Sequence, residues 1–287
     1  MSAGKGVAVN LSVADALVRA RAAGVDRLDA QRLLAHALAR SRSWLLAHDD
    51  ALLDADQVRW LQACLIRHAD GEPLAYLLGE QEFHGLTLSV NPDVLVPRPD
   101  TEVLVNWALE LLGCALAGIE HPAVVDLGCG SGAIALAVKQ AQPRAAVIGT
   151  DNSDAALTVA RANALRLGLD VGFAHGSWWG AVPGQRFHLS LANPPYIAAG
   201  DPHLPALRHE PACALSPGGD GLAALRQIVE GAARHAVPGG WLLLEHGHDQ
   251  AAAVQELLAG RGFGPARSRR DLAGLPRCTG APWPAAN

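Results

Sequence analysis

The sequence predicts an α/β protein with a mostly parallel sheet, preceded by a small helical bundle. After residue 100, short apolar strands alternate with helical segments, which is typical of a parallel sheet covered by helices on both faces. Before residue 79, apolar residues recur at the three- and four-residue spacing of amphipathic helices. Between them, apolar and polar residues alternate around glycine and proline turns, which indicates a β-hairpin. The predicted domains are a bundle over 1–78, a hairpin linker over 79–99 and an α/β domain over 100–287.

The elements follow in order from this periodicity. In the bundle, Ser12 followed by Asp15 resembles a capping box that starts the first helix, and two further helices are predicted over 29–39 and 54–69. In the α/β region the predicted strands are Ala123–Leu127, Ala145–Thr150, Leu189–Ala192 and Trp241–Glu245. The predicted helices there are Val103–Leu112, Ala133–Gln140, Asp154–Leu167, Leu222–His235 and Ala251–Gly260. Residues 281–287 are predicted to form a disordered tail.

Composition limits the classes of function. Half of the 287 residues are apolar, and the net charge of −5 argues against a nucleic-acid backbone as the main partner, because such binding needs clustered Lys and Arg. The five cysteines include no C-x-x-C pair, so neither a disulfide framework nor a cysteine zinc site is predicted. No metal site is expected at Glu245, His246 and His248, which lack a second ligand set. No apolar run is long enough for a membrane span, and we expect a cytoplasmic protein. We also expect the protein to be a monomer.

The first candidate site is the glycine-rich turn Gly128-Cys129-Gly130-Ser131-Gly132, between an apolar strand and an Ala-rich helix. Glycines let the backbone approach a ligand closely, and a helix N-terminus offers N–H groups. A dinucleotide or a methyl donor would fit such a turn. Asp126, at the end of the strand, can accept a hydrogen bond from a cationic amino group, which favours S-adenosylmethionine.

A second acidic residue, Asp151, ends the next predicted strand, 23 residues after Gly128. A carboxylate at this distance and position is placed to bind both hydroxyls of a ribose. The alternative role is to cap the following helix, but Asn152, Ser153 or Asp154 can also provide that cap. The ribose-binding role is therefore preferred.

The most specific motif is Asn193-Pro194-Pro195-Tyr196, which follows an apolar strand. The two prolines remove two backbone donors and hold the turn rigid. The Asn193 side-chain oxygen and the Pro194 carbonyl can both accept from one planar NH₂ group, on which the Tyr196 ring can stack. The lone pair of such a nitrogen is delocalised, so the group must be held in line with the reacting methyl group. The motif predicts methylation of an amide or exocyclic nitrogen without a general base.

These motifs, together with the segments Pro73–Tyr76, Val96–Glu102 and Leu243–Gly247, resemble the peptide chain release factor glutamine N5-methyltransferases over nearly the whole chain. The resemblance implies a Rossmann-like class I fold with a seven-stranded sheet whose last strand is antiparallel. It also implies transfer from S-adenosylmethionine to the glutamine of the Gly-Gly-Gln motif of class I release factors, which the bundle helps to dock. The residues implied are Gly128, Gly130, Gly132 and Asp151 for the donor, Trp178 beside the adenine, and Asn193 to Tyr196 for the glutamine.

Three positions depart from the family pattern. Ser177 stands where the family usually has an acid, and Cys129 stands where it often has Thr or Ser. The ending Pro282-Trp283-Pro284 lacks the expected aromatic pattern, so we expect a frayed last strand. The arginines between Arg261 and Arg277 are interpreted as a solvated edge of the sheet.

Two other substrates share this chemistry. Adenine-N6 DNA methyltransferases also carry N-P-P-Y, but they need a basic cleft and a target-recognition region, and the near-neutral bundle provides neither. A ribosomal-protein glutamine methyltransferase is the closer alternative, because it performs the same reaction on a different protein. The segment 97–102 and the bundle favour the release-factor branch by resemblance.

Overall fold

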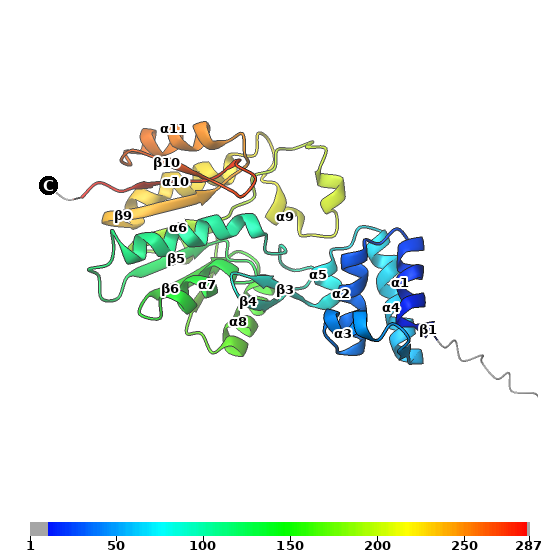
Figure 1. Ribbon diagram of the computed structural model, residues 1–287. Coiled ribbons are helices and arrows are strands. Elements are labelled where there is room, and N and C mark those ends of the chain that lie inside the picture. The colour runs from blue at the N-terminus through cyan, green and yellow to red at the C-terminus, as the bar shows by residue number, and fades with distance from the viewer. Residues whose placement is uncertain (1–10, 286–287) are drawn as a thin grey trace, which may run out of the picture. The chain divides into compact units, whose positions relative to one another are not determined.

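The computed structural model describes residues 11–285, and the chain divides into two compact units after Gly79 (Figure 1). The first unit ends at Gly79, and the second begins at Glu80 and includes the hairpin. The predicted domain limits at residues 1 and 287 lie outside the described residues. Within residues 11–285, no helix is both long enough and apolar enough to cross a membrane.

The first unit is a bundle of short helices around a leucine-rich core. Its helices are α1 (Val13–Ala22), α2 (Arg27–Leu38), α3 (Arg42–Ala47), α4 (Ala55–Ala69) and α5 (Leu74–Leu78), and β1 (Leu11–Ser12) pairs with β2 (Leu52–Leu53). Ser12 caps α1 by accepting from the Asp15 N–H, as predicted. Helix α2 begins before residue 29 because Asp26 caps it. Helices α3 and α5 were not predicted, because segments of five or six residues are too short to show helical periodicity.

The hairpin consists of β3 (Glu80–Phe83) and β4 (Leu86–Ser89). Its two turn residues, His84 and Gly85, both have positive φ angles, 48° and 75°, as a type I′ turn requires. The prediction that the hairpin continues to Pro99 is wrong, since residues 90–99 form no strand and contain three prolines. The buried Asn163 side chain bonds to both backbone groups of Ser89 and to the Ser131 carbonyl, which ties the hairpin to the glycine-rich turn.

The second unit contains a seven-stranded sheet in the order β10-β11-β9-β8-β5-β6-β7. The strands are β5 (Ala123–Leu127), β6 (Ala146–Asp151), β7 (Gly172–His175), β8 (Phe187–Ala192), β9 (Ala236–Glu245), β10 (Arg267–Arg270) and β11 (Pro276–Pro282). Strands β5 to β9 are parallel, and β10 and β11 are antiparallel. This confirms the expected mostly parallel sheet. Strands β7 and β10 escaped prediction because neither is an apolar run.

Helices cover both faces of this sheet. They are α6 (Glu102–Gly113), α7 (Ala133–Ala141), α8 (Asp154–Leu167), α10 (Ala223–His235) and α11 (Ala251–Arg261). The short helix α9 (Ala212–Leu215) lies in the segment between β8 and α10. Successive strand residues point to opposite faces: Val124 packs in one core with α6 and α7, and Val125 packs in another with α10 and α11. The central strands are therefore buried on both sides, which explains their continuous apolar runs.

The predicted tail and frayed last strand are wrong for the described part of the C-terminus. Strand β11 lies between β9 and β10, so both of its edges are paired, and Ala281 is fully buried. The Trp283 N–H donates to the Gly240 carbonyl at 2.6 Å, and its ring packs edge-on against Phe263 at a centroid distance of 5.0 Å. Residues 286 and 287 lie outside the described residues.

Strand β10 forms one edge of the sheet and carries three arginines. Arg269 pairs with Glu110 at 2.7 Å and lies over the Trp107 ring, with its guanidinium carbon 4.7 Å from the centroid. Exposed arginines on an edge strand discourage pairing with another chain.

Candidate active site

The two predicted sites meet where the strand order of the sheet reverses. The chain runs from β5 outward to β6 and β7, and then returns to place β8 on the other side of β5. Leu127 of β5 is in register with Ala192 of β8, so the glycine-rich turn and the N-P-P-Y segment leave adjacent strands side by side. Ligands of open α/β sheets bind at such a switch point, outside the carboxyl ends of the strands.

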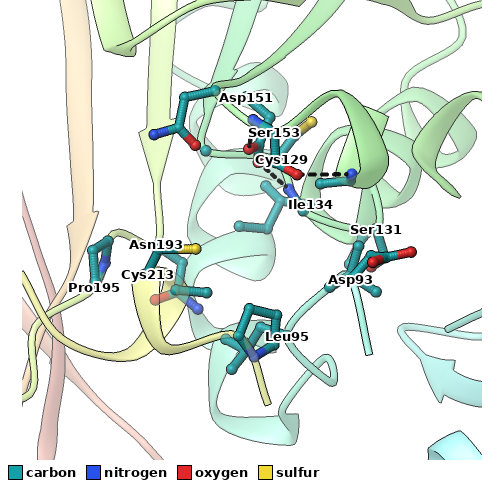
Figure 2. Close-up of a pocket in the computed structure, with 18 of the residues that line it drawn as sticks. Asp93, Leu95, Cys129, Ser131, Ile134, Asp151, Ser153, Asn193, Pro195 and Cys213 are labelled. Carbon is teal, nitrogen blue, oxygen red and sulfur yellow. Dashed lines mark hydrogen bonds between the residues drawn. The ribbon is translucent and has the colours of Figure 1, made fainter. Parts of the chain in front are cut away.

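A pocket opens at this switch point (Figure 2). The predicted site residues that line it are Gly128, Cys129, Gly130, Ser131, Asp151, Trp178, Asn193 and Pro195. Four other predicted residues do not line it: Asp126, Gly132, Pro194 and Tyr196. In Figure 2, Asn193 and Pro195 lie on one side of the pocket, and Asp151, Ser153 and Cys129 lie on another.

The glycine-rich turn is held by main-chain hydrogen bonds to β6. The N–H groups of Gly128 and Cys129 both donate to the Thr150 carbonyl at 2.8 Å. Gly128, Gly130 and Gly132 have φ angles of 76°, 53° and 83°, a region that favours glycine. A Cβ atom on Gly128 would lie 3.0 Å from the Trp178 ring, so this glycine is also required by close contact.

Asp151 fastens the turn at the end of β6. Its Oδ2 accepts from the Gly130 N–H and its Oδ1 from the Ser153 N–H, both at 2.9 Å. The cap of α8 is Ser153, whose hydroxyl accepts from the Ala156 N–H at 3.2 Å. Ser153, and not Asp151, therefore caps α8, and the Asp151 carboxylate lies at the pocket wall.

Asp126 lies behind the turn rather than in the pocket. Its side chain is fully buried, and Oδ2 accepts from the Ala135 N–H in the first turn of α7 at 3.1 Å. Burial raises the pKa of this carboxyl to about 7. Its Oδ1 is buried and has no hydrogen-bond partner within the described residues. The sequence predicted contact with a ligand, whereas the structure gives Asp126 a contact with the helix.

The N-P-P-Y segment is held by side chains from distant parts of the chain. Asn193 Nδ2 donates to Thr101 Oγ1 at 3.1 Å, across 92 residues. The Tyr196 hydroxyl donates to Glu245 Oε1 at 3.3 Å, and Pro194 is buried. Burial is the main cause that raises the pKa values of both the Tyr196 hydroxyl and the Glu245 carboxyl, the latter to about 7.

The two tryptophans after β7 have different surroundings. The Trp178 ring lines the pocket, its φ angle is 47°, and its Nε1 donates to Gln227 Oε1 at 3.1 Å. Trp179 is buried, and its Nε1 donates to the Ile228 carbonyl at 2.7 Å. Ser177, which departs from the family pattern, also lines the pocket.

Sequence reasoning missed much of the pocket wall. The unpredicted lining residues include Asp93, Leu95, Arg98, Thr101, Ile134, Ser153, Pro211 and Cys213. Buried Glu210 joins two of the contributing segments, because it accepts from the Val96 N–H at 3.0 Å and pairs with Arg98. A pattern of neighbouring residues cannot predict the contact between Val96 and Glu210, which are 114 residues apart. The only signal in the sequence was that Arg98 belongs to a segment that carried the family resemblance.

The residues that the structure describes contain no group of three or more His, Cys, Asp or Glu side chains that could hold a metal ion. His246 is buried, with Nε2 2.7 Å from Thr279 Oγ1 and Nδ1 2.8 Å from the Gly247 carbonyl. Burial lowers the pKa of His246.

Comparison with solved structures agrees with this fold. The T. thermophilus 16S rRNA N2 G1207 methyltransferase matches with a TM-score of 0.53 and 21% identity, over 71% of this chain and 49% of that one. A methyltransferase from Pyrococcus furiosus matches with a TM-score of 0.52 and 18% identity, over 70% of this chain and 90% of that one. The sheet order and the antiparallel last strands agree with the Rossmann-like fold of class I methyltransferases.

The sequence comparisons narrow this class to one family. Residues 11–79 match the PrmC N-terminal domain, and residues 105–222 match the methyltransferase small domain. The release factor glutamine methyltransferase of Burkholderia pseudomallei is 49% identical and covers 92% of this chain and 94% of its own length. The Bordetella pertussis enzyme of the same name is 50% identical, over 90% of this chain and 95% of its own. The chain belongs to the release factor glutamine methyltransferase family, which confirms the resemblance.

Proposed function

We propose that this chain transfers a methyl group from S-adenosylmethionine to the side-chain nitrogen N5 of the glutamine in the Gly-Gly-Gln motif of class I peptide chain release factors. The observation that carries the proposal is the hydrogen bond from Asn193 Nδ2 to Thr101 Oγ1. With its nitrogen used in this way, the Asn193 amide offers its oxygen to a substrate NH₂ group. The release factor as substrate is taken from the names of the relatives.

The pocket residues fit S-adenosylmethionine, which supplies a methyl group on a positively charged sulfonium. The backbone of Gly128 to Ser131 would lie along the donor, the Asp151 carboxylate would accept from its ribose hydroxyls, and the Trp178 ring would lie beside its adenine. Asp126 and Gly132 would not contact the donor; they would hold the glycine-rich turn and α7 in place from the buried side. A Cβ atom on Gly132 would come within 3.1 Å of Leu136 and 3.3 Å of Ala160, so this glycine sets the packing of α7.

The N-P-P-Y residues would position the acceptor nitrogen. The Asn193 side-chain oxygen and the Pro194 carbonyl accept its two hydrogens, and the ring of Tyr196 holds the plane of the amide. During methyl transfer, positive charge develops on the nitrogen and strengthens both hydrogen bonds, and the methylated nitrogen then releases one of these two protons to solvent. Fixed acceptors therefore lower the barrier without a side-chain base. Pro195 keeps the turn rigid.

The remaining parts of the proposal concern partners and domains. The first unit, which ends at Gly79, would help to dock the release factor, and the second unit, which begins at Glu80 and includes the hairpin, would carry the reaction. The net charge of −5 supports a protein partner rather than direct binding of nucleic acid. A translation factor as substrate points to a cytoplasmic enzyme, which we propose acts as a monomer.

The proposal is tested by methyl transfer from labelled S-adenosylmethionine to purified class I release factors, ribosomal proteins and adenine-containing DNA in parallel. We expect label on the glutamine of the Gly-Gly-Gln peptide, located by mass spectrometry. A release factor with glutamic acid in place of that glutamine is the matched control and should stay unlabelled. Label on a ribosomal protein alone would keep the mechanism but replace the substrate, and label on DNA alone would overturn the proposal.

A further inference from the structure

The amino-acid end of S-adenosylmethionine needs a binding surface in the pocket. The donor consists of an adenine, a ribose, a sulfonium and an amino-acid group that carries a carboxylate and an ammonium. Trp178 and Asp151 would bind the adenine and the ribose. The sequence placed Asp126 at the ammonium, but the structure places Asp126 behind the glycine-rich turn. Another part of the pocket wall must therefore hold the amino-acid end.

One wall of the pocket carries charges of both signs. It is formed by residues 93–98, which include the lining residues Asp93, Leu95 and Arg98. In Figure 2, Asp93 and Leu95 lie at the end of the pocket away from Asp151. Among the described residues that line the pocket, Arg98 is the only Lys, Arg or His. This wall therefore offers one cation and one anion, which is the charge pattern that complements an amino-acid group.

The backbone at Arg98 is fixed by its two neighbours, Pro97 and Pro99. A residue that precedes a proline is restricted to an extended conformation, and Arg98 has φ −99° and ψ 144°, within that region. Each proline also fixes its own φ angle. The wall therefore presents the Arg98 side chain from a rigid stretch of backbone.

A buried carboxylate from a distant segment holds the Arg98 side chain. Glu210 lies 112 residues further along the chain, and its side chain is 1% exposed. Its Oε2 accepts from the Val96 N–H at 3.0 Å, and its Oε1 accepts from Nη2 of Arg98. A guanidinium has five N–H donors on three nitrogens, and this pair uses one nitrogen. The guanidinium is thus tied to the wall and still has N–H groups for a ligand in the pocket.

We propose that Arg98 binds the carboxylate at the amino-acid end of S-adenosylmethionine. The inference rests on the proposed function, because it takes S-adenosylmethionine as the ligand of this pocket. A guanidinium binds a carboxylate through charge-assisted hydrogen bonds, which are stronger than hydrogen bonds between neutral groups. Methyl transfer does not change this carboxylate, so Arg98 binds the donor and its product, S-adenosylhomocysteine, in the same way.

The competing partner for the carboxylate is the N-terminus of α7. Ala133 and Ile134, the first two residues of α7, also line the pocket, and backbone N–H groups at a helix N-terminus bind anions. A substitution of the Arg98 side chain leaves these backbone groups in place. Variants of Arg98 therefore distinguish the two partners.

The test measures ligand binding by titration calorimetry without a release factor. The ligands are S-adenosylhomocysteine and its decarboxylated analogue, S-adenosyl-3-thiopropylamine, which keeps the amine and lacks the carboxylate. We expect the wild-type enzyme to bind S-adenosylhomocysteine about 10-fold or more tightly than the analogue. Arg98→Gln should reduce this preference to about 3-fold or less by weakening the binding of S-adenosylhomocysteine alone.

Three results would overturn the inference. If the wild-type enzyme binds both ligands equally, the pocket does not recognise the carboxylate. An unchanged preference in Arg98→Gln would assign the carboxylate to the N-terminus of α7. Equal weakening of both ligands in Arg98→Gln would mean that the shape of the wall, and not its charge, supports binding.

A double variant keeps the inference testable if Arg98→Gln folds poorly because the buried Glu210 loses its partner. Arg98→Gln/Glu210→Gln removes both charges, and the amide oxygen at position 210 can still accept from the Val96 N–H. It should show the same loss of preference. Two controls lie outside the pocket lining: Arg269→Gln, at an arginine of β10 that also pairs with a glutamate, and Glu256→Gln, at an exposed carboxyl of α11. Both should keep the wild-type preference.

Kinetics with a release factor give a second measurement. Because the carboxylate contact is the same before and during methyl transfer, Arg98→Gln should raise the KM for S-adenosylmethionine about 10-fold and leave kcat within about 3-fold. A lower kcat at an unchanged KM would overturn the inference, since Arg98 would then act on the transfer itself. If the wild-type enzyme methylates no release factor but the ligand preference depends on Arg98, the substrate proposal fails while this inference stands.

Discussion

The glycine-rich turn and the N-P-P-Y segment leave adjacent parallel strands, yet the structure holds them by different means. The turn is fixed by backbone groups close in sequence, because Gly128 and Cys129 bond to Thr150 at the end of the next strand. The N-P-P-Y segment is fixed by side chains 92 and 49 residues away, through Asn193 to Thr101 and Tyr196 to Glu245. The donor side of the pocket thus depends on local backbone geometry, and the acceptor side depends on tertiary packing.

The largest expected effect is on the acceptor side. Asn193→Ala removes the proposed acceptor of the substrate hydrogens and should lower kcat by about 100-fold or more, because this interaction strengthens in the transition state. The Kd for S-adenosylmethionine, measured by titration calorimetry, should stay within about 3-fold, since backbone groups form most of the donor side. A kcat within a few-fold of wild type would remove Asn193 from the mechanism.

A smaller effect is expected on the donor side, where two glycines form a matched pair. Gly128→Ala adds a Cβ atom 3.0 Å from the Trp178 ring at a φ angle of 76°. We expect this to weaken the binding of S-adenosylmethionine about 10-fold, because the ring must move. Gly130→Ala, at a φ angle of 53°, meets no atom within 4 Å and should cost only backbone strain, of about 1–2 kcal/mol in the free energy of unfolding. Equal Kd values for the two variants would contradict the role of the ring contact.

The contrast between the two sides also explains what the sequence could predict. The turn was predicted in place, since glycine spacing, the preceding strand and Asp151 at the next strand end are local signals. Asn193 was predicted for the same reason. Thr101 and Glu245 were not predicted as the partners of Asn193 and Tyr196, because each contact joins parts of the chain that are far apart in sequence, and no periodicity encodes that.

The prediction of the strands shows the same difference between local signals and long-range contacts. Apolar runs such as Ala123–Leu127 were predicted as strands because both faces are buried in the parallel sheet. The edge strand Arg267–Arg270 has no apolar face and left no pattern to detect. At the C-terminus, Ala281 was assigned to a tail because Pro and Ala dominate the local sequence, whereas pairing with β9 decides its conformation.

The smallest effect concerns Asp126, the carboxyl behind the glycine-rich turn, and it is an effect on stability. Burial raises its pKa to about 7, so between pH 3.8 and about 7 the folded chain holds a proton that the unfolded chain releases. Stability from this group is therefore present at low pH and is lost as pH rises through about 7. Asp126→Asn stays neutral, so from pH 5 to pH 8 its free energy of unfolding in urea should gain about 1–3 kcal/mol relative to wild type. Glu256→Gln should show no such gain, and a pH-independent difference for Asp126→Asn would mean that the buried carboxyl stays ionised throughout.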